Sequence, residues 1–464
     1  MSQQYDLIVI GSGPSGQKAA VQAAKLGKRV AVIERKYVIG GNAVHTGTIP
    51  SKTLRETVLN LSGWRERGFY GKAYRVKQDI TVDDLKQRLE ITLQHEIEVM
   101  QHQLMRNGIE VIRGQAEFVD TNTIRVTSSK DAEPEDYTTD YVILAVGTRP
   151  FRPPNIPFDG RKIMDSDQIL KMQKLPRTMA VVGGGVIGIE YATIFSALDI
   201  NVTVVEAREQ LLEFVDSEII QEFQHQMRDR GMVMRLGESV SDVREDKDGK
   251  VITQLESGRR VVTDLALFCA GRQGNTDSLN LENVGLEADK RGRIEINDQF
   301  QTAVEHIYAV GDVVGFPALA STSMEQGRRA ARHAFTDETT HRLENFPIGI
   351  YSVPEISMAG RTEKDLKEAG IPFESGIARF RETARGQILG LEHGMLKMLF
   401  SLEDRTLLGV HVVGEGATEL VHIGHAVLEL KGKLEYFIES VFNYPTLAEA
   451  YKVAALDAWN RLSR

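Results

Sequence analysis

The chain has 464 residues, 42% of them hydrophobic, and its 56 basic and 65 acidic side chains give a formal net charge of −9. This length suggests about three domains, and the acidic balance argues against nucleic acid or an anionic membrane as the main partner. The only cysteine is Cys269, so one chain cannot form an internal disulfide, a dithiol redox pair or a cysteine-based zinc site. The N-terminus shows no signal or transit peptide, and no apolar stretch approaches the roughly 18 residues of a membrane span. We therefore expect a cytoplasmic protein.

The N-terminal segment predicts a strand, a glycine turn, a helix and a second strand. An apolar run over residues 5–10 precedes Gly-Ser-Gly-Pro-Ser-Gly at residues 11–16, and a second run over residues 29–34 ends in Glu34. This is the G-x-G-x-x-G fingerprint of a dinucleotide-binding βαβ unit. The first glycine permits the tight turn, the second lets the pyrophosphate approach the helix N-terminus, and the third allows close helix–strand packing. The terminal carboxylate accepts hydrogen bonds from ribose hydroxyls.

The next part of the chain predicts a long helix and two strands. Apolar residues recur three and four positions apart over residues 80–109, which predicts a helix facing the core. Strands are expected around residues 123–126 and 141–146, and the proline-rich segment 152–157 is expected to be a linker.

The N-terminal pattern then recurs. An apolar run over residues 179–182 precedes Gly-Gly-Gly-Val-Ile-Gly at residues 183–188, and a strand over residues 201–206 ends in Glu206. From the first glycine to the terminal glutamate, both copies span 23 positions, from 11 to 34 and from 183 to 206. One such fingerprint can be an ordinary strand–helix turn, but two copies with matched spacing indicate two dinucleotide sites.

The C-terminal part contains no third fingerprint. Short strands are expected at residues 395–400 and 407–413, followed by a helix over residues 418–430. We expect an α/β protein with two Rossmann-like dinucleotide-binding domains, for FAD and NAD(P), and a C-terminal α+β domain suited to dimerisation.

Three further stretches accompany the two fingerprints. They are Ala-Val-Gly-Thr-Arg-Pro at residues 145–150, Ala-Gly-Arg at residues 270–272, and residues 302–312, which end in Ile-Tyr-Ala-Val-Gly-Asp. With these motifs the chain resembles, nearly from end to end, the pyridine nucleotide–disulfide oxidoreductase family, such as lipoamide dehydrogenase and glutathione reductase. The resemblance implies an FAD-binding domain at residues 1–150 and 275–345, an NAD(P)-binding domain at 151–274, a dimerisation domain at 346–464, and a homodimer or higher homo-oligomer.

The resemblance also implies which residues bind the two dinucleotides, and it implies no metal site. For FAD they are Gly11, Gly13, Ser15, Gly16, Glu34, Arg35, Gly41, Thr46, Gly47, Lys52, Gly147, Asp312 and Ala320. For NAD(P) they are Gly183, Gly185, Val186, Ile187, Gly188, Glu206, Arg208 and Gly271. Asp312 is expected to meet the ribityl chain of the flavin.

Both family stretches that carry thiol chemistry are altered in this sequence. Ala43 and Thr48 stand where disulfide reductases have cysteines, and Tyr444 stands where the family has its acid–base histidine. Thiol–disulfide exchange needs a proton carrier that titrates near neutral pH, so the two losses are chemically linked. Glu449, which orients that histidine in the family, remains. Drift in an inactive enzyme is the alternative, but both fingerprints and Lys52 are intact.

Without thiol chemistry, the expected reaction is hydride transfer between NADPH and NAD⁺, or between NADH and NADP⁺, through bound FAD with ping-pong kinetics. Residues 271–279, 347–351 and 448–451 resemble the branch of the family that carries out such a transfer. Two alternatives remain open. One is an NAD(P)H:quinone or dye reductase that recruits Tyr444 to deliver protons, and the other is a flavoprotein that senses nucleotides without turnover.

Lys52, Glu190, Tyr444 and Glu449 are the candidate catalytic residues. By the resemblance, Lys52 and Glu190 form an ion pair beside the flavin, where positive charge stabilises the reduced cofactor. The alternative for each is a solvated surface charge.

Five other side chains bear on ligand choice or on a possible metal site. Glu206 favours NAD because its carboxylate repels the 2′-phosphate of NADP, whereas Arg208 either pairs with that phosphate or is a solvated loop charge. His45 lies beside the missing disulfide and either faces the flavin or is structural. His422 and His425 are three positions apart without a third ligand, so we expect interface packing and no metal.

Overall fold

The computed structural model describes residues 4–129, 132–336 and 345–462. The chain divides into two compact units. The first lies within Met1–Thr53, Lys86–Phe151 and Gly271–Leu343, and the second lies within Leu54–Leu85, Arg152–Ala270 and Glu344–Arg464. Each unit therefore combines segments that are far apart in the sequence.

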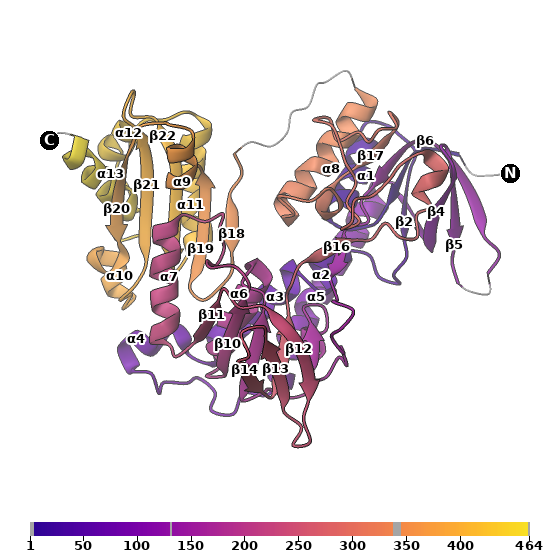
Figure 1. Cartoon of the computed structure of the whole chain (residues 1–464). Coiled ribbons are helices and arrows are strands. Elements are labelled where there is room, and N and C mark those ends of the chain that lie inside the picture. The colour runs from indigo at the N-terminus through magenta and orange to yellow at the C-terminus, as the bar shows by residue number, and fades with distance from the viewer. Residues whose placement is uncertain (1–3, 130–131, 337–344, 463–464) are drawn as a thin grey trace. The chain divides into compact units, whose positions relative to one another are not determined.

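The first unit contains a seven-stranded sheet in the order β3-β2-β1-β6-β5-β4, with β17 paired to β6 (Figure 1). β1 pairs in parallel with β2 and β6, and β4, β5 and β6 form an antiparallel meander. A parallel sheet is covered on both faces, which explains why β1 is apolar and buried along most of its length. The strands are β1 Gln4–Ile10, β2 Val30–Glu34, β3 Glu110–Arg113, β4 Gln115–Asp120, β5 Thr123–Thr127, β6 Glu135–Leu144 and β17 Ile307–Ala309, with a separate ribbon of β7 Thr148–Pro150 and β16 Arg272–Gly274.

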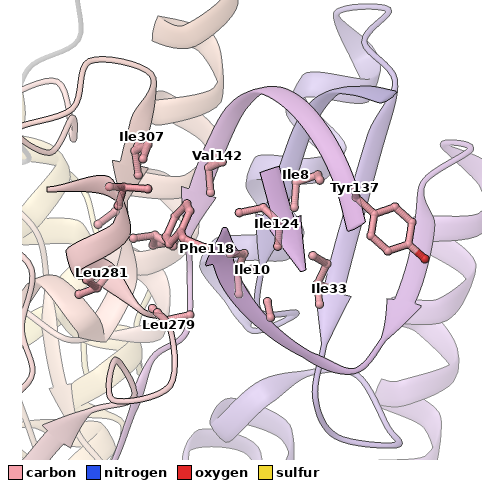
Figure 2. Packing of buried hydrophobic residues seen from close by; sticks show 14 of the residues in the cluster. Ile8, Ile10, Ile33, Phe118, Ile124, Tyr137, Val142, Leu279, Leu281 and Ile307 are labelled. Carbon is pink, nitrogen blue, oxygen red and sulfur yellow. The ribbon is translucent and has the colours of Figure 1, made fainter. Parts of the chain in front are cut away.

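Helices cover one face of this sheet, and a loop-rich layer covers the other. Alanines of α1 and α8 pack with β1 and β2 in one core cluster, to which α5 adds Met100 and Leu104. The opposite cluster joins Ile8 and Ile10 of β1 to Phe118 of the meander and to Leu279 and Leu281 (Figure 2). The helices are α1 Pro14–Lys25, α2 Gly41–His45, α5 Val82–Arg106 and α8 Ala320–Phe335, and α3 Thr48–Leu61 runs from the first unit into the second.

The second unit contains a parallel five-stranded sheet and a separate antiparallel meander. The sheet order is β11-β10-β9-β15-β8, and the meander order is β12-β13-β14. The strands are β8 Ile163–Asp165, β9 Thr178–Val182, β10 Asn201–Glu206, β11 Val233–Leu236, β12 Val240–Glu245, β13 Val251–Leu255, β14 Arg260–Thr263 and β15 Leu265–Phe268. The helices of this part are α4 Arg67–Tyr70, α6 Val186–Ser196 and α7 Ser217–Asp229.

The same unit holds a five-stranded antiparallel sheet near the C-terminus, in the order β18-β19-β22-β21-β20. α11 packs on β19 and β22, and α13 packs on β20 and β21. The strands are β18 Ile348–Ile350, β19 Glu355–Gly360, β20 Phe373–Arg379, β21 Met395–Ser401 and β22 Leu407–Gly414. The helices are α9 Glu363–Glu368, α10 Ala384–Ile388, α11 Ala417–Glu429, α12 Leu434–Glu439 and α13 Glu449–Leu462.

Most elements expected from the sequence are confirmed, with one clear shift. Both βαβ units, the long helix (α5) and the C-terminal strands and helix lie within a few residues of their expected bounds. The strand expected at 141–146 instead begins at Glu135 and ends at Leu144, because its polar first half pairs with β5 while burying only alternate residues. In the described part of the chain, no helix has the length and apolar character needed to cross a membrane.

A buried lysine joins the antiparallel sheet of the second unit to two helices. The side chain of Lys397, on β21, is 1% exposed, and its Nζ lies 2.9 Å from Asp216, 3.1 Å from Glu218 and 2.6 Å from Glu363. Asp216 is also the N-cap of α7, where it accepts a hydrogen bond from the Glu218 backbone N–H. Burial alone lowers the pKa of Lys397, but the three carboxylates outweigh it and raise this pKa above its usual value.

The Lys397 network predicts that two lysine substitutions differ strongly in how much they lower the free energy of unfolding. Lys397→Ala leaves the buried carboxylate of Asp216 without its lysine partner and should lower the free energy of unfolding by about 3–5 kcal/mol. Lys367→Ala removes an exposed lysine that pairs with the same Glu363 and should cost at most about 1 kcal/mol. Urea denaturation followed by circular dichroism measures both, and equal midpoints for the two variants would contradict the prediction.

Candidate functional site

The N-terminal glycine turn shows why two of its three glycines are required by the protein itself. Gly11 has a φ of +108°, and a Cβ there would lie under 3.0 Å from the carbonyl oxygen of Ala145. A Cβ on Gly16 would lie under 3.0 Å from the carbonyl oxygen of Gly11. Gly13 differs, because a Cβ there would meet nothing closer than 4.0 Å, the Cα of Gly41. The chain therefore leaves open space beside Gly13.

The second glycine turn repeats this division of roles. Gly183 has a φ of +110°, and a Cβ there would lie 2.5 Å from the carbonyl oxygen of Cys269. A Cβ on Gly188 would lie under 3.0 Å from the carbonyl oxygen of Gly183, whereas at Gly185 it would meet no described atom within 4 Å. The middle glycine of each turn is thus free of any steric demand from the described protein, which fits the close approach of a ligand.

Both open glycines are N-caps of helices. Gly13 precedes α1 and Gly185 precedes α6, which starts with Val186 and Ile187, and neither helix has a side-chain cap. The first N–H groups of an uncapped helix, together with its dipole, form a site for an anion. The two turns therefore fit the pyrophosphates of two dinucleotides.

The glutamate at the end of each βαβ unit is hydrogen-bonded to its own glycine turn. Glu34 accepts hydrogen bonds from the backbone N–H of Ser12 at 3.1 Å, from the Ser12 hydroxyl at 2.6 Å, and from the backbone N–H of Lys36 at 2.9 Å. Glu206 accepts one from the backbone N–H of Gly184. The two carboxylates are buried, so these bonds hold each acid at the carboxyl end of its strand, where a ribose would bind.

Among the residues that the structure describes, only the second acid is paired with a cation. Arg208 donates to Glu206 from its backbone N–H at 3.0 Å and from its side-chain Nε at 2.9 Å. Burial raises the pKa of Glu206, but the hydrogen bonds from Arg208 and Gly184 outweigh it and hold the pKa below its usual value. The carboxylate is therefore ionised and its charge is compensated, while the half-exposed guanidinium of Arg208 faces solvent in part. The pairing with Glu206 argues against the interpretation of Arg208 as a purely solvated loop charge, and its role as a phosphate ligand stays a prediction.

Asp312 lies in a partly buried polar cluster of the first unit. The Thr148 hydroxyl donates to Asp312 at 3.3 Å and accepts from Nε of Arg272 at 2.7 Å. Arg272 and the side-chain amide of Asn42 both donate to the Thr148 carbonyl. Burial raises the pKa of Asp312 above its usual value, although Arg272 and Thr148 act in the opposite direction. The sequence predicted a cofactor-binding role for Asp312 but not for Asn42, Thr148 or Arg272. The last two lie inside the family motifs at residues 145–150 and 270–272.

Several other residues expected to bind FAD gather near the first turn. Gly41 has a φ of +59°, and a Cβ there would lie 2.8 Å from the Cα of Gly13. The Thr46 hydroxyl is buried and has no hydrogen-bond partner among the described residues, and Gly147 has a φ of +63° with open space beside it. A bound cofactor would fit all three features. It could fill the open space beside Gly147 and offer a hydrogen-bond partner to the Thr46 hydroxyl, and the close approach of Gly41 to Gly13 leaves no side chain in its way. Their roles, and those of Ser15, Arg35, Gly47, Gly271 and Ala320, stay predictions.

The two members of the expected ion pair lie in different units. Lys52 is a half-buried residue of α3 in the first unit. Glu190 is on α6 in the second unit, is 4% exposed, and accepts a hydrogen bond from the backbone N–H of Tyr351 at 2.8 Å. Burial rules out the solvated interpretation for Glu190, because buried carboxylates are retained only with partners. The pairing with Lys52 stays a prediction.

The altered catalytic stretches fall on α2, α3 and the loop before α13. Ala43 lies on α2 and Thr48 is the first residue of α3. Tyr444 is 75% exposed, and Glu449, the first residue of α13, accepts a hydrogen bond from the backbone N–H of Arg385 at 3.2 Å. Glu449 thus keeps a backbone partner although the histidine of the family is absent.

The histidines of interest have structural partners. Nε2 of His45 lies 2.9 Å from the carbonyl oxygen of Ile39, which favours the structural interpretation. The rings of His422 and His425 are 6.4 Å apart, and His425 contacts the Asn345 carbonyl. The described residues include no cluster of three or more His, Cys, Asp or Glu suited to a metal ion.

Two family models match the chain. The model described as pyridine nucleotide-disulphide oxidoreductase matches residues 5–327, and the model of its dimerisation domain matches residues 346–455. The chain belongs to the pyridine nucleotide-disulphide oxidoreductase family. The family membership confirms the expected fold class, and the second match indicates a homo-oligomer. The exact domain boundaries stay predictions.

Curated relatives and solved structures extend over the whole chain. It is 53% identical over 460 residues to a soluble pyridine nucleotide transhydrogenase of Mycobacterium tuberculosis, with 99% of this chain and 98% of the relative covered. It is 44% identical over 465 residues to the enzyme of the same name from Aliivibrio fischeri, with the same shares covered. Among solved structures, LpdA from Mycobacterium tuberculosis is similar with a TM-score of 0.89 and 25% identity, covering 98% of this chain and 99% of that one. The HOCl-induced flavoprotein disulfide reductase RclA from Escherichia coli is similar with a TM-score of 0.87 and 25% identity, covering 97% and 99%.

The different roles of the glycines predict that one alanine substitution weakens dinucleotide binding and that another lowers the stability of the fold. Gly185→Ala places a Cβ in open space at a negative φ, so the thermal midpoint should stay unchanged while the KM values for NADH and NADPH rise about tenfold or more, a loss of about 1.4 kcal/mol. Gly188→Ala forces a Cβ against backbone and should destabilise the fold by about 1–3 kcal/mol. Thermal melts and steady-state assays test both, and an equal loss of stability in the two variants would refute the assignment.

Proposed function

We propose that this chain is a cytoplasmic FAD-dependent enzyme that moves hydride between NADPH and NAD⁺, and between NADH and NADP⁺, without a redox disulfide. One observation carries the proposal: two dinucleotide turns with open middle glycines occur in a chain with a single cysteine. When bound, FAD supplies the chemistry of accepting and returning a hydride. The names of the relatives at 44–53% identity support the same activity.

The proposal assigns separate tasks to the two turns. The first turn, with Glu34, holds the resident FAD, and the polar cluster around Asp312 holds its ribityl chain. The second turn, with Glu206, binds the exchangeable nicotinamide dinucleotide. Hydride transfer between two nicotinamides needs no protein acid or base, which is consistent with Tyr444 in place of a histidine. Lys52 contributes positive charge beside the reduced cofactor, with Glu190 as its partner.

We further propose that the homo-oligomer is built from homodimers formed through residues 346–464. Large apolar side chains are unusually exposed in this segment, with Val441 at 94% and Leu430 and Tyr444 also largely exposed. Such exposure is typical of surfaces that another chain covers. In the proposed dimer, the segment of Tyr444 and Glu449 completes the site of the partner subunit.

A single exchangeable site predicts ping-pong kinetics. With NADPH as donor and thio-NAD⁺ as acceptor, the first product must leave before the second substrate binds. Double-reciprocal plots at several fixed acceptor concentrations should therefore be parallel, and the same should hold for NADH with thio-NADP⁺. Intersecting lines, no turnover with NADPH, or turnover with a quinone far above that with thio-NAD⁺ would contradict the proposed function.

The Glu206–Arg208 pair supports the use of both dinucleotides. An unpaired glutamate at this position repels a 2′-phosphate, but the structure holds Glu206 in hydrogen bonds with Arg208 and Gly184. The 2′-phosphate of NADP(H) would meet the guanidinium of Arg208, whereas the ribose hydroxyls of NAD(H) would meet the carboxylate. Arg208 thus offsets a charge that would otherwise exclude NADP(H).

Substitution of Arg208 should separate the two dinucleotides. Arg208→Gln removes the guanidinium that offsets Glu206, so the KM for NADPH should rise about tenfold or more while the KM for NADH changes by less than about twofold. Steady-state assays with thio-NAD⁺ and thio-NADP⁺ as acceptors measure both values. An equal rise in the two KM values would show that Arg208 supports the turn without reading the 2′-phosphate.

A further inference from the structure

A second arginine–glutamate pair lies next to the Glu206–Arg208 pair. Glu238 follows the end of β11 by two residues, and its backbone N–H donates to the carbonyl oxygen of Glu206 at 3.0 Å. The Gly237 N–H donates in the same way to the carbonyl oxygen of Arg208 at 2.9 Å. These two bonds join the segments that leave β10 and β11 at the carboxyl edge of the parallel sheet. In folds of this type, ligands bind at that edge.

The partner of Glu238 comes from the hairpin between β13 and β14. Nη1 of Arg259 donates to the Glu238 carboxylate at 3.1 Å. The hairpin is tied to the same place, because the Glu256 N–H donates to the Ser239 carbonyl at 2.9 Å. The Arg259 carbonyl also accepts from the Leu255 N–H at 2.9 Å, which closes the turn. Arg259 is therefore held beside the carboxyl edge, although it lies more than fifty positions beyond Glu206 in the sequence.

The exposure of this pair is asymmetric in the same way as that of the first pair. The Glu238 side chain is 10% exposed, and the Arg259 side chain is 67% exposed. The guanidinium of Arg259 is thus largely open to solvent, whereas the carboxylate of Glu238 is largely buried. An ion pair this exposed on its cationic side adds little to stability, and its guanidinium stays accessible to a ligand.

We propose that Arg259 is a second specificity-determining residue, which together with Arg208 binds the phosphate on the 2′ position of the adenosine ribose. This inference rests on the proposed use of NADP(H). A phosphate monoester carries close to two negative charges at neutral pH and presents three acceptor oxygens, and two guanidinium groups satisfy these better than one. When NAD(H) binds instead, both arginines stay paired with their glutamates and no buried carboxylate loses its partner. The two pairs therefore allow one site to accept either dinucleotide.

The test measures binding without turnover. Isothermal titration of the full-length, flavin-bound protein with 2′,5′-ADP and with 5′-AMP isolates the contribution of the 2′-phosphate, because the two ligands differ only in that group. Arg259→Gln should weaken the binding of 2′,5′-ADP about fivefold or more and leave that of 5′-AMP unchanged. The difference between the protein and this variant should shrink as salt is raised from 50 to 500 mM, since exposed charges are screened.

Arg244→Gln is the matched control. Arg244 lies on β12 of the same meander and pairs with the exposed Asp242 at 2.6 Å, so this variant removes an equal charge from the same sheet. It should leave the binding of 2′,5′-ADP within about twofold of the unsubstituted protein. Arg259→Lys keeps the charge without the planar fork and should give an intermediate affinity, which provides a second measurement if Arg259→Gln does not fold.

The outcomes separate the inference from the function on which it rests. If the unsubstituted protein does not prefer 2′,5′-ADP over 5′-AMP, the proposed use of NADP(H) fails. If that preference exists but Arg259→Gln and Arg244→Gln behave alike, the proposed function stands and the role of Arg259 is overturned. If Arg259→Gln weakens both ligands equally, the residue supports the fold of the hairpin and the inference is overturned as well.

Discussion

The close approach of two backbone segments at each glycine turn is the constraint on which the rest of this structure depends. In both turns the third glycine packs against the carbonyl oxygen of the first, at a separation that leaves no room for a Cβ. This contact brings the start of a helix onto the end of a strand, and it leaves the middle glycine facing open space. The free N–H groups of the helix then point to the same place. This packing creates two places suited to an anion, one in each unit of the chain.

The second consequence concerns what a chain with these sites can do chemically. The solved structures that are similar in fold include a flavoprotein disulfide reductase, but a chain with one cysteine cannot cycle a dithiol. The loss of both cysteine positions at Ala43 and Thr48 is matched by Tyr444 at the other end of the chain. Hydride transfer between nicotinamides needs neither a thiol nor a proton carrier. The altered positions therefore agree with one another under the proposed reaction, and they conflict under thiol chemistry.

Dinucleotide choice illustrates how local charges are balanced. A carboxylate is needed for ribose hydroxyls, yet the same carboxylate repels a 2′-phosphate. Under the proposed function, this conflict is resolved by pairing the buried acid with a half-exposed arginine, as in Glu206 with Arg208. Glu238 and Arg259 repeat the arrangement on the neighbouring strand end. In each pair the carboxylate keeps a hydrogen-bond partner when no ligand is bound.

The sequence by itself determined the features that depend on local order along the chain. Glycine spacing, apolar periodicity and the terminal acids predicted both βαβ units, because these patterns are carried by residues close together in the chain. The cysteine count excluded a disulfide within one chain, because it depends on composition alone. Only the tertiary structure decided that Glu206 is buried and paired and that Lys397 binds three carboxylates. It also decided that Asp312 lies in a cluster with Asn42, Thr148 and Arg272, and that Arg259 lies beside the carboxyl edge of the sheet. Most of these arrangements join residues many positions apart. Burial disfavours their charges, and the hydrogen bonds and ion pairs that offset this cost form only after the segments have packed together. A pattern within one segment carries no information about such partners, because a charged side chain looks the same in sequence whether it is solvated or buried.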